Sequence, residues 1–567
     1  MTSCAPIPQL ASINAYARDR HGAPCDLDLG GTESQVSAPL AEDGADVLAG
    51  ATRYPDPAPL ARALAGLHGI AASHVLVTAG ADDALERACR AMLCPGRNAI
   101  LTNPTFEMIP RYVALTGADT RFAPWPSGAL PVGEIISRAD ANTTLIGIVT
   151  PNNPTGSAAS LADIARVHDA VPQALVLLDL AYADFAAEDL TRALLGLPRA
   201  IVVRTLSKAW GLPGLRVGYA MSDPAVLRWL RDVGSPFPVA SASLAVAERT
   251  VVRSAAVRDE TVSRTRANRA RLCALLTELG VEPLDTQANF VTVAGDRARW
   301  IRDVLAGFGI ATRFFTGGDC ARTRITVPVD ARALVRVEHA LRCGVDPEVV
   351  LFDLDGVIAD VSNSYRETIQ RTAAAFGATV SAGDIRERKA RGHANDDWRV
   401  TADLVHAAGI NASLEDVTNT FERIYQGDAG SEGLNASERP LVSREWLASF
   451  ASRCPLGIVT GRPRADARFF LDRFGLTEFF AVVVVREDAP LKPNPAPITR
   501  ACTELGVKRA WMIGDTRDDI VAARAANALP IGVVPPGDPP DDIGASLTHA
   551  GAARVLGTTM EVRACLS

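Results

Sequence analysis

The sequence has no run of lysine and arginine, although it contains 58 of these residues against 65 aspartates and glutamates. A surface that binds the phosphate backbone of nucleic acid needs its basic residues concentrated in one patch or stripe. Here charges of both signs are mixed along the chain, and the formal net charge is −7. We therefore expect no nucleic acid among the partners of this protein.

Closely paired cysteines are also missing. The ten cysteines are scattered through 567 residues without the C-x-x-C spacing of zinc and redox sites. In a chain of this length that pattern indicates reduced, mostly buried thiols, so we expect a cytoplasmic protein. The first twenty residues lack a basic segment followed by an apolar one, and no window reaches the roughly 18 uncharged apolar residues of a membrane span. We expect neither secretion nor membrane insertion.

What is present is an ordinary globular composition, with 48% hydrophobic and 22% charged residues. A chain of 567 residues exceeds the size at which one hydrophobic core keeps growing, which predicts several domains. From about residue 45 to 345, short apolar runs such as 75–77, 145–149, 175–178 and 201–203 alternate with amphipathic segments. This alternation is typical of βαβ units around a largely parallel sheet.

A second α/β pattern begins at residues 349–352 and continues through apolar runs at 456–459, 482–485 and 510–513. Between its first two predicted strands lies a polar, helix-favouring stretch, about 365–440, which we interpret as an inserted helical cap. We therefore divide the chain into domains at 1–345 and 346–567. In both, polar residues follow the predicted strands, where open α/β sheets bind their ligands.

Residues 204–219 read RTLSKAWGLPGLRVGY and follow an apolar strand. They resemble the cofactor-lysine segment of class I and II aminotransferases, which implies the type I fold of the enzymes that depend on pyridoxal 5′-phosphate (PLP). The resemblance makes Lys208 the residue that bonds to PLP and then carries the α-proton. It also implies that Ser207 and Arg216 hold the cofactor phosphate.

Further segments follow in the family's order, among them TPNNPTG at 150–156 and LDLAYADF at 178–185. They imply that Asp179 pairs with the pyridinium nitrogen and keeps the ring protonated as an electron sink, while Asn153 and Tyr182 reach its O3′ oxygen. The other implied cofactor contacts are the amides of Ala81 and Asp82 at a helix N-terminus, the ring of Phe106, and Tyr54 donated across a homodimer interface.

Within this class the resemblance, over roughly residues 10–345, is nearest to histidinol-phosphate aminotransferase. It rests on RYPDP, TAGADDA, PTF, the two segments above and the tail at 309–327. Arg313 and Arg324 match the family's substrate-facing pair, which binds the substrate phosphate in one half-reaction and the glutamate carboxylate in the other. Two segments depart from the family: Asn-Glu-Asn-Pro is replaced by Gly-Thr-Glu-Ser at 31–34, and Asp-Glu-Ala-Tyr by Asp-Leu-Ala-Tyr at 179–182.

Residues 350–358, VLFDLDGVI, resemble the first motif of the haloacid dehalogenase-like (HAD) superfamily. The resemblance implies a Rossmann-like domain in which Asp353 is the nucleophile and Asp355 the general acid and base. The second aspartate favours phosphate-ester hydrolysis over cleavage of carbon–phosphorus or carbon–halogen bonds. The later motifs place Thr460 and Lys492 at the phosphoryl group, and Asp515 and Asp519 at a Mg²⁺ ion that also binds Asp353 and the Asp355 carbonyl.

Together the two resemblances predict a bifunctional enzyme acting on small molecules. Imidazole-acetol phosphate would be aminated by glutamate to histidinol phosphate, and this product hydrolysed to histidinol, two consecutive steps of histidine biosynthesis. One alternative keeps both reactions but uses another ketone phosphate, giving an amino alcohol for a specialised metabolite. A second makes one half a silent regulatory module. In the cap, residues 391–399 are either a helix cap with a packed Trp398 or a substrate contact.

Overall fold

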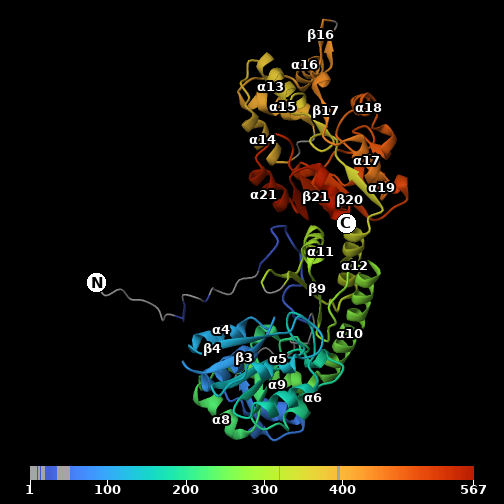
Figure 1. Cartoon of the computed structure of the whole chain (residues 1–567). Coiled ribbons are helices and arrows are strands. Elements are labelled where there is room, and N and C mark those ends of the chain that lie inside the picture. The colour runs from blue at the N-terminus through green and yellow to red at the C-terminus, as the bar shows by residue number, and fades with distance from the viewer. Residues whose placement is uncertain are drawn as a thin grey trace. The chain divides into compact units, whose positions relative to one another are not determined.

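A computed structural model describes residues 9–10, 13, 19–34, 51–317, 320–392, 396–428 and 430–566. By their internal contacts they form two units (Figure 1). The first contains Leu29–Arg299 and Thr312–Val335, and the second contains Arg20–Asp28, Trp300–Ala311 and Arg336–Ser567. The boundary predicted after residue 345 coincides with the end of helix α12 (Ala331–Val345), while the second unit also takes in segments that precede it.

The first unit is built on a seven-stranded sheet in the order β2-β8-β7-β6-β5-β3-β4. Its strands are β2 (Val75–Thr78), β3 (Asn98–Asn103), β4 (Asp119–Pro124), β5 (Thr143–Val149), β6 (Leu175–Asp179), β7 (Ala200–Thr205) and β8 (Gly218–Met221). The four apolar runs are confirmed as β2, β5, β6 and β7. Only β8 runs antiparallel to its neighbours β2 and β7, because the chain returns from β7 to β8 without a crossover helix.

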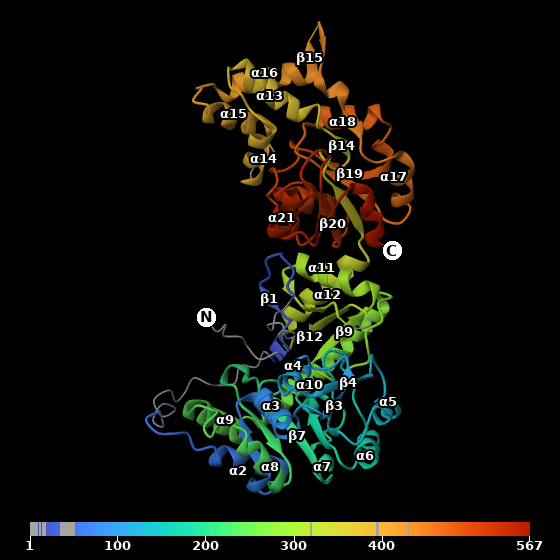
Figure 2. The same cartoon turned by 60° about the vertical axis from the view of Figure 1, so that its left-hand side comes forward.

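Helices flank this sheet (Figure 2). Both of its faces are apolar. Val176 and Leu178 of β6 enter one core, whereas Leu175 and Leu177 enter another. A strand buried on both faces is apolar at every position, which is why these strands read as continuous runs. The helices are α2 (Ala58–His68), α3 (Gly80–Met92), α4 (Met108–Leu115), α5 (Val132–Ser137), α6 (Leu161–Ala170), α7 (Thr191–Leu194), α8 (Pro224–Asp232), α9 (Ser241–Arg253) and α10 (Ala255–Glu278).

A smaller antiparallel sheet carries the predicted substrate arginines. Its order is β11-β12-β9, from β9 (Phe290–Ala294), β11 (Arg313–Phe315) and β12 (Arg322–Thr326). Arg313 and Arg324 are register partners on neighbouring strands. The antiparallel pairing therefore sets the two arginines side by side, which their separation in the sequence does not reveal.

The second unit contains a six-stranded parallel sheet in the order β19-β18-β13-β20-β21-β22. The strands are β13 (Val349–Phe352), β18 (Leu456–Val459), β19 (Phe480–Val484), β20 (Ala510–Gly514), β21 (Leu529–Val533) and β22 (Arg554–Leu556). Helices α17 (Arg444–Ala451), α18 (Arg464–Arg473), α19 (Ala496–Leu505), α20 (Arg517–Ala525) and α21 (Pro540–Ala550) connect and extend them. Because β13 lies between β18 and β20, the polar residues that follow these three strands meet at one sheet edge.

The predicted helical cap is present between β13 and β18. It consists of α13 (Tyr365–Ala375), α14 (Ala382–Ala390), α15 (Asp397–Ala407) and α16 (Leu414–Gln426), followed by the short hairpin β15 (Gly427–Asp428) and β16 (Ser431–Glu432). The chain enters and leaves the cap through an antiparallel pair, β14 (Ala359–Asp360) and β17 (Arg439–Pro440). Figures 1 and 2 both show the cap helices grouped together beyond the sheet edge of this unit.

Helices α11 (Asp296–Gly307) and α12 contribute to the core of the second unit. The ring of Trp300 lies 5.5 Å from that of Trp511 on β20. Trp511 is fully buried, and its Nε1 donates to the Cys343 carbonyl at 2.6 Å. The Arg554 guanidinium lies over Trp300 and is paired with Asp303 at 2.7 Å. These contacts make residues before 346 part of the same core.

We therefore expect a fragment that begins at residue 346 to be unstable, because it exposes Trp511 and removes the hydrogen-bond acceptor of its indole. Loss of such aromatic packing costs about 3–5 kcal/mol, a large part of the stability of a domain. The measurement is chemical denaturation of fragment 346–567 against the full chain, followed by tryptophan fluorescence. A fragment as stable as the second unit of the full chain would contradict this expectation.

Candidate active sites

Eleven of the twelve residues predicted for the first site line one cavity of about 220 Å³ in the first unit. They are Ala81, Asp82, Phe106, Asn153, Asp179, Tyr182, Ser207, Lys208, Arg216, Arg313 and Arg324. Tyr54 is not among the lining residues; it is 81% exposed and stacks on Phe237, with ring centroids 4.6 Å apart. Tyr54 thus faces solvent within its own chain, and its donation to a second subunit stays a prediction.

Lys208 lies in a network of hydroxyl and amide groups. Its Nζ donates to Thr32 Oγ1 at 2.6 Å, and that oxygen lies 3.3 Å from the Tyr182 hydroxyl. Asn153 Nδ2 donates to the same tyrosine oxygen at 3.4 Å. Lys208, predicted to bond PLP, is thus linked through Thr32 to Tyr182, and Tyr182 contacts Asn153 directly; these last two are the residues predicted to reach O3′.

Thr32 is a contact that the sequence did not reveal. It is 2% exposed and has a φ of 58°, a conformation that strains a β-branched residue. Its carbonyl accepts from Asn289 Nδ2 at 3.0 Å, and its amide donates to Thr326 Oγ1 at 3.1 Å. The Gly-Thr-Glu-Ser segment, which departs from the family, therefore places a hydroxyl beside the lysine.

Asp179 ends β6 and is 4% exposed. Burial raises the pKa of its carboxyl to about 7, although the Ala181 amide donates to Oδ1 at 3.0 Å. A carboxylate in this position is stabilised by a cation inside the cavity, and a pyridinium N–H is such a partner. The donor set at this end of the cavity therefore fits PLP.

We expect Asp179→Asn to stabilise the cofactor-free protein above pH 7 while it weakens PLP binding and activity. Because the folded pKa of Asp179 is raised, its favourable contribution is fully present below pH 3.8 and is lost as the pH rises through about 7. The shift of about three units corresponds to at most ~4 kcal/mol. The measurement is the melting temperature of cofactor-free Asp179→Asn and wild type, taken at steps of about one pH unit between pH 5 and 9.

Asp184→Asn is the matched control. Asp184 pairs with the buried Arg204 guanidinium at 2.8 Å, so neutralising it should destabilise the protein instead of stabilising it. If cofactor-free Asp179→Asn melted below wild type at every pH, the proposed burial cost of the carboxylate would be wrong.

Helix α3 presents its N-terminus to the same cavity. Gly80 begins the helix, and Ala81 and Asp82 line the cavity with unpaired first-turn amides of the kind that bind phosphate. A side chain at Gly218 would collide with the Gly80 carbonyl carbon at 2.4 Å, so glycine lets β8 approach this helix end. Arg216 Nη2 lies 3.2 Å from Asp82 Oδ2. A phosphate here would find helix amides and a guanidinium together.

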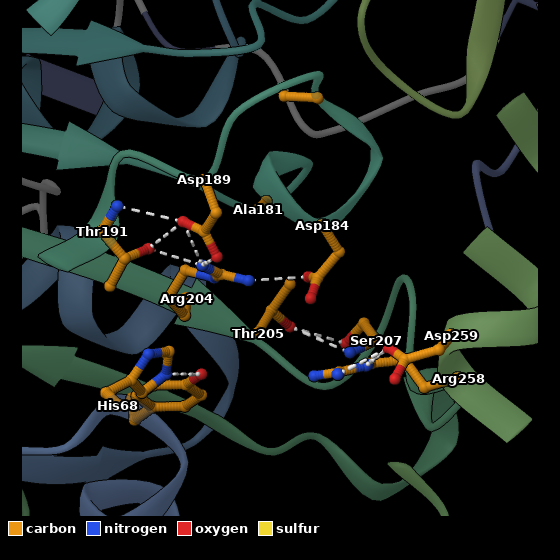
Figure 3. Close-up of polar contacts among 12 residues, drawn as sticks. His68, Ala181, Asp184, Asp189, Thr191, Arg204, Thr205, Ser207, Arg258 and Asp259 are labelled. Atoms are coloured by element: carbon orange, nitrogen blue, oxygen red, sulfur yellow. Dashed lines mark hydrogen bonds and ion pairs between the residues drawn. The ribbon is translucent and has the colours of Figure 1, made fainter. Parts of the chain in front are cut away.

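Figure 3 shows the contacts of Arg204 that join the segment after β6 to β7. The buried Arg204 guanidinium donates to Asp184 at 2.8 Å, to Asp189 at 2.8 Å and to Thr191 at 2.5 Å. Next along the chain, Thr205 Oγ1 donates to Ser207 Oγ at 3.0 Å. This buried ion cluster ties the segment after Tyr182 to the segment that carries Lys208.

The two arginines face the cavity from the small sheet. Arg324 Nη1 donates to Asn153 Oδ1 at 2.6 Å, and its Nη2 donates to the Gly30 carbonyl at 2.7 Å. Arg313 pairs with Glu107 at 2.9 Å. Glu107, which sequence reasoning also missed, follows Phe106 directly and brings a carboxylate to the substrate end. An anionic substrate group that binds Arg313 competes with Glu107.

In the second unit, Asp353, Asp355 and Asp515 line a cavity of about 280 Å³ between the sheet edge and the cap. Lys492 Nζ lies 3.0 Å from Asp353 Oδ1 and 2.5 Å from Asp519 Oδ1. The same amine donates to the Val459 carbonyl at 3.0 Å. The buried lysine therefore joins the predicted nucleophile, Asp353, to Asp519 in the first turn of α20.

Asp353, Asp515 and Asp519 each offer one carboxylate oxygen within 4.8 Å of the others. Burial raises the pKa of Asp353; the Lys492 ammonium opposes this, and the Asp519 and Asp355 carboxylates add to it. A divalent cation with oxygen ligands fits such a cluster. Gly356 has a φ of 71°, and a side chain there would lie 2.4 Å from Asp515 Oδ2, so the glycine of the DLDG motif keeps the cluster open.

Thr460 is buried at the end of β18, and its Oγ1 accepts from the Arg462 amide at 3.2 Å. In the cap, Asp396 caps α15 by accepting from the Arg399 amide at 3.3 Å, while Trp398 lines the cavity. Trp398 Nε1 donates to Glu422 at 2.9 Å, and Arg486 stacks on its ring. The helix cap and the cavity lining are thus both present, and residues 393–395 of this segment lie outside the described residues.

Asp179 ends β6, and Lys208 follows the neighbouring strand β7. Both residues share a cavity with the N-terminus of α3. This arrangement defines a PLP-dependent enzyme of fold type I. The chain belongs to the class I and II aminotransferases, whose family model matches residues 38–337. A second model, haloacid dehalogenase-like hydrolase, matches residues 347–527. The chain is therefore an enzyme that combines an aminotransferase with a HAD-like hydrolase domain, and PLP and Mg²⁺ are the cofactors typical of these families.

Curated relatives include aminotransferases. Histidinol-phosphate aminotransferase of Shewanella amazonensis is 32% identical over 54% of this chain and 86% of its own length, and aromatic amino acid aminotransferase of Mycobacteroides abscessus is 31% identical over 59% and 98%. Imidazoleglycerol-phosphate dehydratase of Phytophthora nicotianae is 41% identical over 225 residues, 37% of this chain and half of the relative. The crystal structure of histidinol-phosphate aminotransferase from Sinorhizobium meliloti with PLP has a TM-score of 0.53 at 23% identity, covering 60% and 97% of the two chains, which supports the fold.

No helix among the described residues combines the length and the apolar character that a bilayer crossing requires.

Proposed function

We propose that the first unit aminates imidazole-acetol phosphate with glutamate and that the second hydrolyses the resulting histidinol phosphate to histidinol. The observation that carries this proposal is the pair Arg313 and Arg324. They are register partners on neighbouring strands and line the same cavity as Lys208. Two guanidinium groups suit a reaction whose two substrates each bring an anionic group to the same position. Phosphate on the ketone and carboxylate on glutamate are such groups.

The names of two relatives support the same substrate class. One is a histidinol-phosphate aminotransferase, and the other, an imidazoleglycerol-phosphate dehydratase, is named for a phosphorylated imidazole alcohol. A phosphatase fused to an aminotransferase suits a substrate whose phosphate group is bound by the first site and whose phosphate-ester bond is cleaved in the second. Another relative is named an aromatic amino acid aminotransferase, so the identity of the ring on the substrate has to be tested by experiment.

In the first site, PLP supplies an electron sink for the carbanion at the substrate α-carbon. The Asp179 carboxylate would hold the ring nitrogen, and the amides of Ala81 and Asp82 with Ser207 and Arg216 would hold the phosphate. The Lys208 amine would take the proton from the substrate α-carbon in one half-reaction and supply it there in the other. We also propose a homodimer in which Tyr54 reaches the phosphate site of the second subunit, since the Tyr54–Phe237 stack is exposed.

In the second site, an Asp353 oxygen attacks phosphorus while the ester bond to the leaving alcohol breaks. Asp355 gives its proton to the leaving oxygen, then takes one from the water that cleaves the aspartyl phosphate. Thr460 and Lys492 hold the phosphoryl oxygens. Asp353, Asp515 and the Asp355 carbonyl would hold Mg²⁺, which supplies positive charge against the phosphate, with Asp519 behind them.

The test is one incubation of purified protein with imidazole-acetol phosphate, glutamate and Mg²⁺. We expect 2-oxoglutarate, histidinol and inorganic phosphate from wild type, and histidinol phosphate without phosphate release from Asp353→Asn. If the protein exchanges glutamate nitrogen and hydrolyses generic phosphate esters but leaves this ketone unchanged, the substrate is another ketone phosphate. If one of the two activities is missing altogether, the silent-module alternative replaces the proposal.

A further inference from the structure

Arg462 connects the predicted acid Asp355 to the base of the cap. It follows β18 in the Thr-Gly-Arg segment, and its side chain is 1% exposed. Its Nε donates to Asp355 Oδ1 at 2.7 Å, and its Nη2 lies 2.5 Å from the same oxygen. Both contacts go to Oδ1, so the guanidinium does not engage the other carboxylate oxygen, Oδ2, and Asp355 lines the cavity together with Asp353.

The far side of the same guanidinium is held by Glu438, which is 2% exposed. Arg462 Nη1 donates to Glu438 Oε2 at 3.0 Å, and Nη2 donates to Oε1 at 3.3 Å. A buried guanidinium between two carboxylates is held in one plane, because its five N–H groups point in fixed directions. Arg462 therefore has a defined orientation that depends on Glu438.

Glu438 lies where the chain leaves the cap, immediately before β17, and it also binds the segment that enters the cap. Ser364 Oγ donates to Glu438 Oε1 at 2.8 Å, and the Tyr425 hydroxyl of α16 donates to it at 3.0 Å. The Tyr365 ring lies 5.0 Å from the Arg462 guanidinium carbon. Both connections to the cap and two of its helices thus converge on the group that holds Asp355.

We propose that Arg462, held by Glu438, is a positioning residue that aims Oδ2 of Asp355 at the oxygen of the leaving alcohol when the cap base is assembled. This inference rests on the proposed phosphatase function. As the Asp353 oxygen bonds to phosphorus and the P–O ester bond breaks, the proton on Asp355 Oδ2 moves to the departing oxygen. The resulting carboxylate then takes a proton from water as that water's oxygen bonds to phosphorus, which releases inorganic phosphate and regenerates Asp353.

The test compares two esters that differ in how much they need this proton. 4-Nitrophenolate leaves without protonation. The leaving group of histidinol phosphate, the alkoxide of histidinol, has to be protonated. We compare kcat/KM, which reports the transfer of the phosphoryl group to Asp353 and not the later hydrolysis that both esters share. We expect Arg462→Met to lower kcat/KM for histidinol phosphate by about 100-fold or more, the size of a general-acid contribution, and kcat/KM for 4-nitrophenyl phosphate by less than tenfold. Glu438→Gln should give a smaller loss with the same preference, and Arg462→Lys should recover part of the alkyl activity.

Equal losses on the two esters in Arg462→Lys and Glu438→Gln would overturn the proposal, since a general structural defect does not discriminate between leaving groups. These two variants carry the test if Arg462→Met does not fold. Arg464→Ala is the matched control: it removes an arginine two residues further along, at the first position of α18, which pairs with Asp488 at 2.6 Å, and it should leave both rates unchanged. Asp355→Asn gives the full leaving-group effect. A wild-type protein that hydrolyses neither ester would refute the phosphatase function itself.

Discussion

Lys208→Ala is expected to abolish transamination, lowering the rate of 2-oxoglutarate formation by roughly 1,000-fold or more, while phosphate-ester hydrolysis continues at the wild-type rate. A positioned general base contributes about 100- to 10,000-fold, and Lys208 also provides the bond that orients PLP. The amine is already placed in the cavity by Thr32 Oγ1 at 2.6 Å. A small primary amine added to the buffer should restore part of the activity, because it replaces the missing proton carrier.

Labelling gives this prediction a second measurement. The chain has only four lysines, Lys208, Lys389, Lys492 and Lys508, so borohydride reduction of the PLP-loaded protein and peptide mapping identify the attachment residue directly. The label should map to Lys208 in wild type and disappear in Lys208→Ala. Label on another lysine, or an active Lys208→Ala, would exclude the proposed role. Lys508→Ala, which alters an exposed lysine, is the control.

Lys492→Met is expected to remove phosphatase activity and to destabilise the second unit in the absence of divalent metal. It leaves the Asp353 and Asp519 carboxylates, which are 6% and 0% exposed, without the cation that lies 3.0 and 2.5 Å from them. Removing one member of a buried ion pair costs about 3–5 kcal/mol. The loss of one preorganised contact to the phosphoryl group lowers the rate by about 100- to 1,000-fold.

Mg²⁺ should recover part of the stability of this variant but little of its activity. The metal ion supplies positive charge to the same carboxylates, yet it does not replace the ammonium group beside the transferred phosphoryl group. The measurement is the melting temperature of Lys492→Met and wild type in EDTA and in Mg²⁺, with Lys508→Met as the control. A variant as stable as wild type in EDTA would show that the lysine does not balance these charges.

Much of the fold follows from local sequence. The runs at 175–178 and 201–203 are apolar at every position, so they predict strands buried on both faces, and the two cores confirm this. The antiparallel β8 was not predicted, because Gly218–Met221 resembles its parallel neighbours in composition and only the route of the chain sets its direction. The second unit's use of Trp300 and Cys343 was also missed, since packing across distant segments leaves no local pattern.

The sequence by itself determined the class of chemistry, because Lys208, Asp179, Asp353 and Asp355 each stand in a motif whose spacing relative to a strand end is short and local. Only the tertiary structure decided what holds these groups. Thr32 reaches Lys208 from 176 residues away in the chain, and Glu438 reaches Arg462 from 24 residues away, on the other side of α17 and β18. The physical reason is that a catalytic group is fixed in direction by neighbours in space, and the chain must fold before residues so far apart can form a hydrogen bond.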